Sequence, residues 1–177
     1  MKINNRTKAT ALIVIFTALT FFDCLFTYIA TPDLSREANP LVRRFGLGWP
    51  ALILSNLLVL GIFCLLVWYS YVIYQSTPFE AFGFRDFMKK IDKRRKHSSF
   101  IAALGYAMGF SMILGRLMPV VEWAVYLAGY IMRWYENIKG KIPFHRPDLW
   151  VTGIFAIVFC VVWYIKEYRS NQRNFRT

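Results

Sequence analysis

The chain has 177 residues, of which 56% are hydrophobic and 18% charged, and its formal net charge is +12. Soluble domains are nearer a quarter charged, and their apolar residues do not gather into long uncharged runs as they do here. The composition therefore excludes a soluble globular domain and predicts an all-α polytopic membrane bundle, formed as one domain over residues 1–177. Lys and Arg set the topology of such a protein, so the positive charge gives no reason to expect a nucleic-acid partner.

The first predicted span covers about residues 9–30 and follows the short basic segment MKINNRTK. Lys and Arg before a first span place the N-terminus in the cytoplasm, so we expect a multi-pass protein of the cell membrane, either an inner or a plasma membrane. The apolar run is too long for a cleaved signal peptide, which predicts that it is retained. The second span, about residues 50–75, follows an outer loop and ends in an aromatic cluster typical of the headgroup level.

A strongly basic segment, residues 76–97, separates the second span from the third. Its apolar residues recur at roughly helical spacing: Phe84, Phe87, Met88 and Ile91. The pattern over residues 84–97 predicts a basic amphipathic helix on the cytoplasmic leaflet, with membrane lipids, and their anionic headgroups in particular, as its partners. The alternative is a solvated loop whose charge only fixes the orientation of the protein.

The third predicted span, about residues 98–118, carries small residues at intervals of four. Among its small residues are Gly105 and Gly109, which form a G-x-x-x-G pair. Small side chains let helix backbones approach closely in lipid. The pattern predicts a central helix, and it also allows a homodimer through Gly105 and Gly109.

The next stretch is ambiguous, because three residues interrupt its apolar run: Arg116, Pro119 and Glu122. A single helix over residues 98–135 would be about 57 Å long, too long for one crossing. Residues 120–135 therefore form either an interfacial aromatic helix or a fifth span. The balance of Lys and Arg between the two sides is the same for both topologies. We favour four spans, because a turn within residues 116–122 leaves little room.

The last predicted span covers about residues 148–165, and the basic tail after it is expected to be cytoplasmic and mobile. The three cysteines each lie in a different apolar run, and the chain has no C-x-x-C motif. We interpret Cys24, Cys64 and Cys160 as small buried hydrophobic residues rather than redox groups or zinc ligands.

Asp23 stands out because an acid inside a span is costly, which makes it a functional-site hypothesis by default. Thr27 lies four residues further on and shares its helix face. The four-span topology brings other polar residues to the same outer level, which predicts an acidic pocket near the outer leaflet. We assign catalytic roles to Asp23, Glu37 and Glu122, and substrate binding to Thr27, Asn39, Asn56, Arg116 and His145.

Two interpretations of this cluster stay open. In the structural one, Arg116 neutralises Asp23 or Glu122 and only fixes the arrangement of the helices. In the functional one, carboxylates around an arginine bind a cation, a proton or a polar headgroup and perform acid–base chemistry. A metal site would use Asp23, Glu37 and His145, whose spacing is not diagnostic, and the sequence leaves any cofactor undetermined.

The first helical hairpin carries the pattern D-x3-T followed by E-x-N-P: Asp23, Thr27, Glu37, Asn39 and Pro40. This order resembles that of a family of small uncharacterised prokaryotic polytopic membrane proteins, which are grouped as a domain of unknown function. The resemblance covers about the first two spans and extends to Arg116 in the third. It implies a shared architecture and a shared outer site, but no known reaction.

Three functions from different classes fit these observations. The first is a membrane-embedded enzyme that acts on a lipid or a lipid-linked substrate. The second is a small proton- or cation-coupled transporter, or a subunit of one, with Asp23 as the coupling group. The third is a non-catalytic membrane assembly factor that docks through its basic loop. The chain has neither an H-E-x-x-H nor a G-x-S-x-G motif, so the sequence does not decide whether it is an enzyme.

Overall fold

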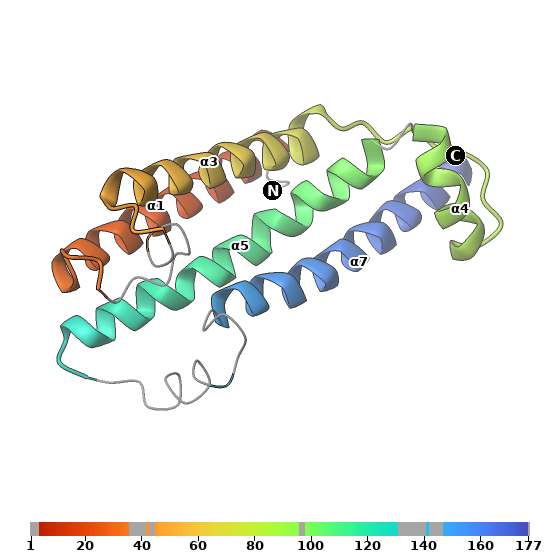
Figure 1. Ribbon diagram of the computed structural model, residues 1–177. Coiled ribbons are helices and arrows are strands. Elements are labelled where there is room, and N and C mark those ends of the chain that lie inside the picture. Colours follow the sequence, from red (N-terminus) through yellow and green to blue (C-terminus); the bar gives the residue numbers. More distant parts are fainter. Residues whose placement is uncertain are drawn as a thin grey trace.

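The computed structural model describes residues 4–35, 42, 45–95, 98–130, 141 and 147–176. Within these residues it has four long helices: α1 (Asn5–Ala30), α3 (Trp49–Trp68), α5 (Ser98–Leu127) and α7 (Pro147–Arg176). One π-helical turn, η1 (Tyr69–Ile73), extends α3, and a shorter helix, α4 (Phe84–Arg95), precedes α5. The predicted all-α bundle is confirmed (Figure 1).

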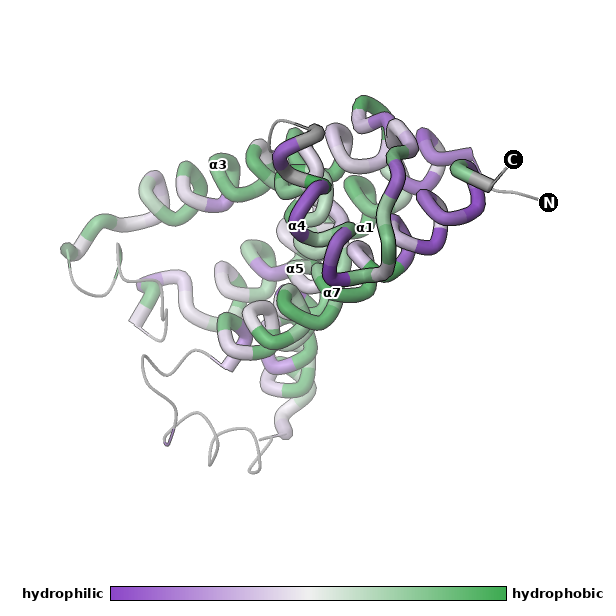
Figure 2. The backbone as a smooth tube through the Cα atoms, turned by 90° about the vertical axis from the view of Figure 1, so that its right-hand side faces the viewer, coloured by the Kyte–Doolittle hydropathy of each residue, from purple (hydrophilic) through white to green (hydrophobic). Residues whose placement is uncertain are grey.

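Among the residues that the structure describes, four segments are long and apolar enough to cross a membrane: Asn5–Ala30, Trp49–Ile73, Ser98–Leu127 and Pro147–Phe175. Many of their large apolar side chains are exposed on the outside of the bundle, as at Leu65 (74% exposed) and Ile157 (69%). An apolar outer surface suits contact with lipid. The helices also satisfy their own backbone hydrogen bonds, as the hydrocarbon core of a bilayer requires. The chain is therefore an integral membrane protein. Hydrophilic residues gather around α4 and near the two chain ends (Figure 2).

Helix α5 is the centre of the bundle. Helices α1 and α3 pack together on one side of it, and α7 packs on the other (Figure 1). The start of α1, η1, α4 and the last turns of α7 lie toward one end, called here the α4 end. The other end, called the opposite end, is formed by Ala30, Trp49, Leu127 and Pro147.

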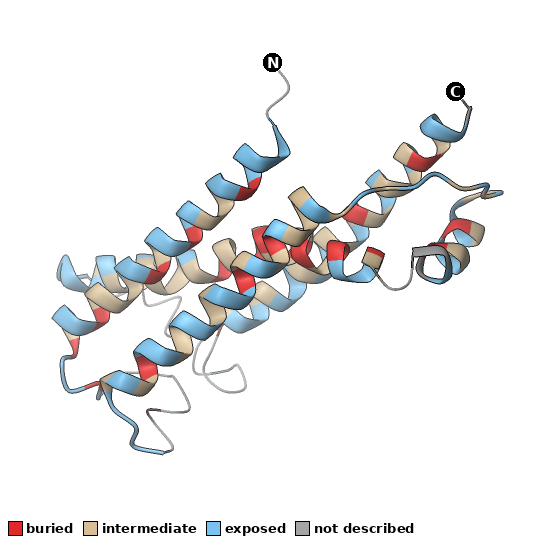
Figure 3. Cartoon of the chain, turned by 90° about the horizontal axis from the view of Figure 1, so that it is seen from above, coloured by how far each residue is buried: buried red, intermediate tan, exposed pale blue. Residues whose placement is uncertain are grey.

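Small residues on α5 make its close contacts, and buried residues follow the length of this helix (Figure 3). A Cβ atom at Gly105 would collide with the backbone carbonyl of Leu66 in α3, and one at Gly115 would collide with the hydroxyl of Thr152 in α7. Gly109 is buried as well. These glycines therefore let α5 pack closely against its neighbours within one chain. The homodimer through Gly105 and Gly109 stays a prediction.

Helix α5 does not end near Pro119 but continues for 30 residues to Leu127. Residues 120–127 therefore extend the third span, and the expectation that they start an interfacial helix or a fifth span is wrong. Gly129, whose φ is +82°, follows the last helical turn. Beyond it the N–H of Tyr130 donates to the carbonyl of Val125 at 3.0 Å, as in a Schellman motif.

The sequence of α5 explains why Pro119 does not break the helix. A proline lacks an N–H, so the carbonyl four residues earlier, that of Gly115, loses its usual helical partner. Membrane helices tolerate such a residue where neighbouring helices pack around the altered turn. Gly115 is buried against α7 at this turn. The stop signal of α5 is therefore Gly129, and Pro119 is an interior residue of the helix.

The C-terminal tail is helical, and the expectation of a mobile tail is wrong. Helix α7 continues well past its apolar part, to Arg176. Asn171 is only 1% exposed, and its side chain binds both backbone groups of Phe79. Gln172 donates to the carbonyl of Ala81 at 3.0 Å. These contacts with the segment before α4 give the polar end of α7 a partner that a free tail would lack.

Candidate functional site

One face of α1 carries the first part of the site. Phe16, Thr20, Asp23 and Thr27 follow one another at intervals of four, three and four residues, so they share a face. The hydroxyl of Thr27 is buried and donates to the backbone carbonyl of Asp23 at 2.8 Å. Thr20 donates to the carbonyl of Phe16 in the same way, at 2.9 Å. The threonines thus satisfy their hydroxyl protons within α1, and Asp23 is the charged group of this face.

Arg116 of α5 joins three helices through its guanidinium group. Its Nη1 donates to Oδ2 of Asp23 in α1 at 2.5 Å, and its Nη2 donates to Oδ1 of Asn56 in α3 at 2.9 Å. Asp23, Asn56 and Arg116 are here named the Arg116 cluster. The structure thus brings together one predicted catalytic residue and two predicted binding residues.

Two further side chains support the cluster. The amide Nδ2 of Asn56 donates to Sγ of Cys24 at 3.3 Å, which fixes the amide so that its oxygen faces Arg116. The ring centroid of Phe16 lies 5.9 Å from Cζ of Arg116, within the range of a cation–π contact. The sequence gives a signal for Phe16, because it lies two helical turns before Asp23 on the same face.

The Arg116 cluster is balanced in charge and largely buried. The side chain of Arg116 is 17% exposed and that of Asp23 is 14% exposed. A lone charge at this position would be costly, whereas the pair has no net charge and shares hydrogen bonds. Asp23 lies about 10 Å along the axis from the end of α1 at Ala30, and Asn56 lies about as far from the start of α3. The cluster is therefore nearer the opposite end than the α4 end.

The α1–α3 hairpin closes above the cluster through contacts of Trp49. Its Nε1 donates to the carbonyl of Pro32 at 2.8 Å, and its ring meets that of Tyr28 edge to face at 5.4 Å. Beside this contact, Asp33 accepts hydrogen bonds from the backbone and side chain of Ser35, which hold the pKa of Asp33 below its ordinary value. The contacts of Trp49 thus join the start of α3 to the end of α1.

Of the remaining predicted residues, Thr27 bonds to the backbone of Asp23, and Glu122 lies on α5. Glu122 lies six residues beyond Arg116 in the same continuous helix, so the two residues are about 120° apart around the helix axis. Glu37, Asn39 and His145 lie outside the described residues. Among the residues that are described, no three His, Cys, Asp or Glu side chains lie close enough to hold a metal ion. The catalytic and binding roles stay predictions.

Comparisons with protein-family models, curated proteins and solved structures find no match for this chain. Fold and site define its class: a four-span helical membrane protein whose central helix carries an arginine paired with an aspartate of the first span. The resemblance of its first hairpin to a family of uncharacterised membrane proteins stays a prediction.

Proposed function

We propose that this protein is a membrane-embedded enzyme acting on a lipid or lipid-linked substrate, whose anionic headgroup binds Arg116. One observation carries the proposal: the two terminal nitrogens of Arg116 bind acceptors on two different helices, Asp23 and Asn56. A guanidinium group with both nitrogens directed into one site matches a phosphate or a carboxylate, which accepts two parallel hydrogen bonds.

The charges of the cluster suggest how such a substrate would start a reaction. An incoming anion would take over the donors of Arg116 and release the carboxylate of Asp23 from this ion pair. A carboxylate in a poorly hydrated site is then a good acceptor for a proton from a hydroxyl group or a water molecule. Asp23 would act as the general base, and the resting pair would keep it inactive until substrate binds.

The remaining predicted residues complete the proposed site. Thr27 lies one turn from Asp23 and its oxygen can still accept a hydrogen bond, because the hydroxyl proton is already donated to the helix. Glu37 and Glu122 are proposed as further acids, and Asn39 and His145 as headgroup contacts. Their types suit these roles, since amide and imidazole groups donate to phosphate oxygens and carboxylic acids protonate leaving groups.

The proposal is tested with the purified full chain in lipid nanodiscs that contain a total membrane lipid extract. The lipids are compared by mass spectrometry before and after incubation with the wild type, Asp23→Asn and Arg116→Lys. We expect Asp23→Asn to abolish turnover without unfolding the protein, because the amide keeps an oxygen for Arg116. Asp33→Asn is the matched control, since it removes the same charge from an exposed loop.

Three outcomes separate this function from the alternatives. Loss of folding in Asp23→Asn would assign the pair to structure, as in an assembly factor. An unchanged lipid profile combined with pH-dependent ion flux, lost in the same variant, would indicate the transporter. The depth of the cluster favours the enzyme, since transport sites tend to lie near the midplane, and Asp23 lies only about 10 Å from the end of α1.

A further inference from the structure

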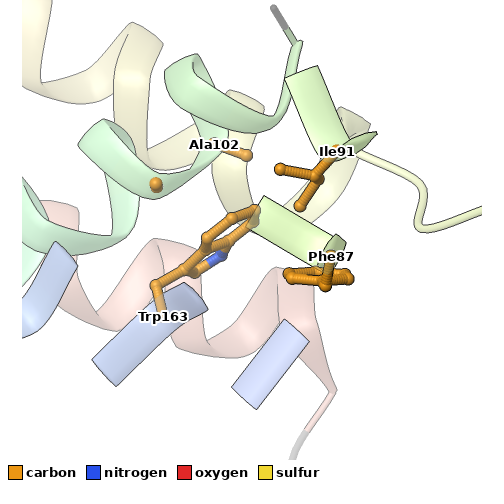
Figure 4. Packing of buried hydrophobic residues seen from close by; sticks show 5 residues of the cluster. Phe87, Ile91, Ala102 and Trp163 are labelled. Carbon is orange, nitrogen blue, oxygen red and sulfur yellow. The ribbon is translucent and has the colours of Figure 1, made fainter. Parts of the chain in front are cut away.

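Helix α4 is docked on the bundle by one stripe of its surface. Phe87 and Ile91 are fully buried and pack with Ala102 of α5 and Trp163 of α7 (Figure 4). The ring of Phe87 also meets that of Tyr168, with centroids 5.4 Å apart. The predicted apolar face of this helix is thus partly used inside the protein.

The segment before α4 is fixed as firmly as the helix itself. Oδ1 of Asn171 accepts the N–H of Phe79 at 2.9 Å, and Nδ2 of the same residue donates to the carbonyl of Phe79 at 2.8 Å. The ring of Phe79 stacks on Phe87 at 5.5 Å. Helix α4 is therefore held in one position against α5 and α7.

This position lies at the boundary between membrane and water. Helix α4 packs beside Ala102, only four residues after α5 begins at Ser98. On α7 it packs from Trp163 to Tyr168, where the apolar run gives way to Lys166, Glu167 and the polar tail. Tryptophan and tyrosine are enriched at this level of membrane proteins.

The outward side of α4 carries two adjacent rows. Three exposed cations follow one another at intervals of four: Arg85, Lys89 and Lys93. Beside them lie Met88, 37% exposed, and Phe84, which is 42% exposed although one edge of its ring meets Tyr168 of α7. Lys90 is different, because its ammonium group binds Asp86 at 2.7 Å. The outer surface thus joins a positive row to an apolar row at the membrane boundary.

We propose that this outer surface of α4 binds the anionic phospholipids of the adjacent leaflet. Arg85, Lys89 and Lys93 would contact headgroup phosphates, and Phe84 and Met88 would enter the boundary with the acyl chains. Charge complementarity and depth favour this partner over nucleic acid or an acidic protein, because neither of those calls for an apolar row at the level of the headgroups. The inference does not depend on the proposed enzyme.

The test is hydrogen–deuterium exchange of the full chain in nanodiscs of phosphatidylcholine, with and without phosphatidylglycerol. We expect the amides of α4 to exchange about ten- to a hundredfold more slowly with the anionic lipid, because three cations each add a favourable contact. The difference should disappear in Arg85→Gln/Lys89→Gln/Lys93→Gln and shrink in 1 M salt.

A second triple variant is the matched control. Arg6→Gln/Arg169→Gln/Arg173→Gln removes the same charge from exposed residues at the same end and should keep the effect on α4. Equal exchange of α4 in both kinds of nanodisc would overturn the proposal, as would an effect that survives the α4 triple variant. Protection by added RNA or polyglutamate but not by phosphatidylglycerol would also overturn it, by assigning the surface to an acidic macromolecule.

Discussion

The two ends of the bundle hold their buried polar groups in opposite ways. Near the opposite end, Arg116 and Asp23 bring full charges into an apolar setting and neutralise each other between helices. At the α4 end, Asn171 is buried without charge and binds the backbone of Phe79 with both ends of its amide. The first arrangement joins side chains of separate helices, and the second holds a segment without regular secondary structure.

The difference lies in what each arrangement can do. An amide that binds both backbone groups of one residue satisfies them and has no charge to transfer, so it acts as a fixed support. An ion pair can be opened by another charge, and each partner then interacts strongly with whatever replaces the other. The Arg116 cluster is therefore the responsive end of the molecule, and the Asn171 contact is the static end.

The largest effect should come from breaking the ion pair on one side. Arg116→Ala removes the guanidinium group from the carboxylate of Asp23, and we expect a loss of about 3–5 kcal/mol in the free energy of unfolding. The measurement is denaturant unfolding of the purified protein in micelles, with Arg6→Ala, an exposed arginine, as the control. Removing both charges in Asp23→Leu/Arg116→Met should recover most of the loss. Additive losses in the double variant would show that the two residues act independently.

A smaller effect is expected at the static end. Asn171→Leu keeps most of the side-chain volume but leaves the N–H and carbonyl of Phe79 to find water, at a cost of about 2 kcal/mol. Limited proteolysis of residues 76–83 should become faster, while the Arg116 cluster is unaffected. Gln172→Ala removes one hydrogen bond and should have a weaker effect in the same assay. Equal proteolysis of all three proteins would contradict the role of Asn171.

The smallest effect concerns the first turn of α4. Asp86 accepts hydrogen bonds from Lys90 and from the N–H of Phe82, and these lower its pKa. Because the folded-state pKa lies below the unfolded value, the stabilisation is complete above about pH 4 and disappears as pH falls through the lowered pKa. Helicity of this turn, followed by NMR, should decrease on acidification. Asp86→Asn should show the reduced helicity at neutral pH and little further change with acid.

The fold could be predicted from the sequence because lipid leaves few choices. Apolar runs of membrane length must form helices, which predicts four spans, and the described part of the chain has four such helices. The length of the apolar stretch 98–135 also suggested that the helix breaks at Pro119. This prediction was wrong, because a helix of 30 residues can tilt in the membrane and because the stop signal is at Gly129. The tail after residue 165 showed no apolar periodicity, so only its contacts with Phe79 and Ala81 reveal its order.

The level of the site along the helices could be predicted from the sequence, but its individual contacts could not all be predicted. Topology placed Asp23, Asn56 and Arg116 at one level, and the structure joins them. The choice of Asp23 over Glu122 as the partner of Arg116 depends on the rotation of α5, which follows from a continuous helix through Pro119. Cys24 as an acceptor for Asn56 could not be foreseen, because a thiol in an apolar run gives no signal for its hydrogen bond.

The pairing of Asp23 with Arg116 also orders the events of synthesis. The two residues are 93 positions apart, so Asp23 leaves the ribosome about 5–20 s before its partner. During that interval the first span must enter the bilayer before Arg116 has been made. Arrival of the third span then neutralises the acid and locks three helices together. The ion pair is thus a late step of assembly, and it reports that the first three spans have been inserted in the correct order.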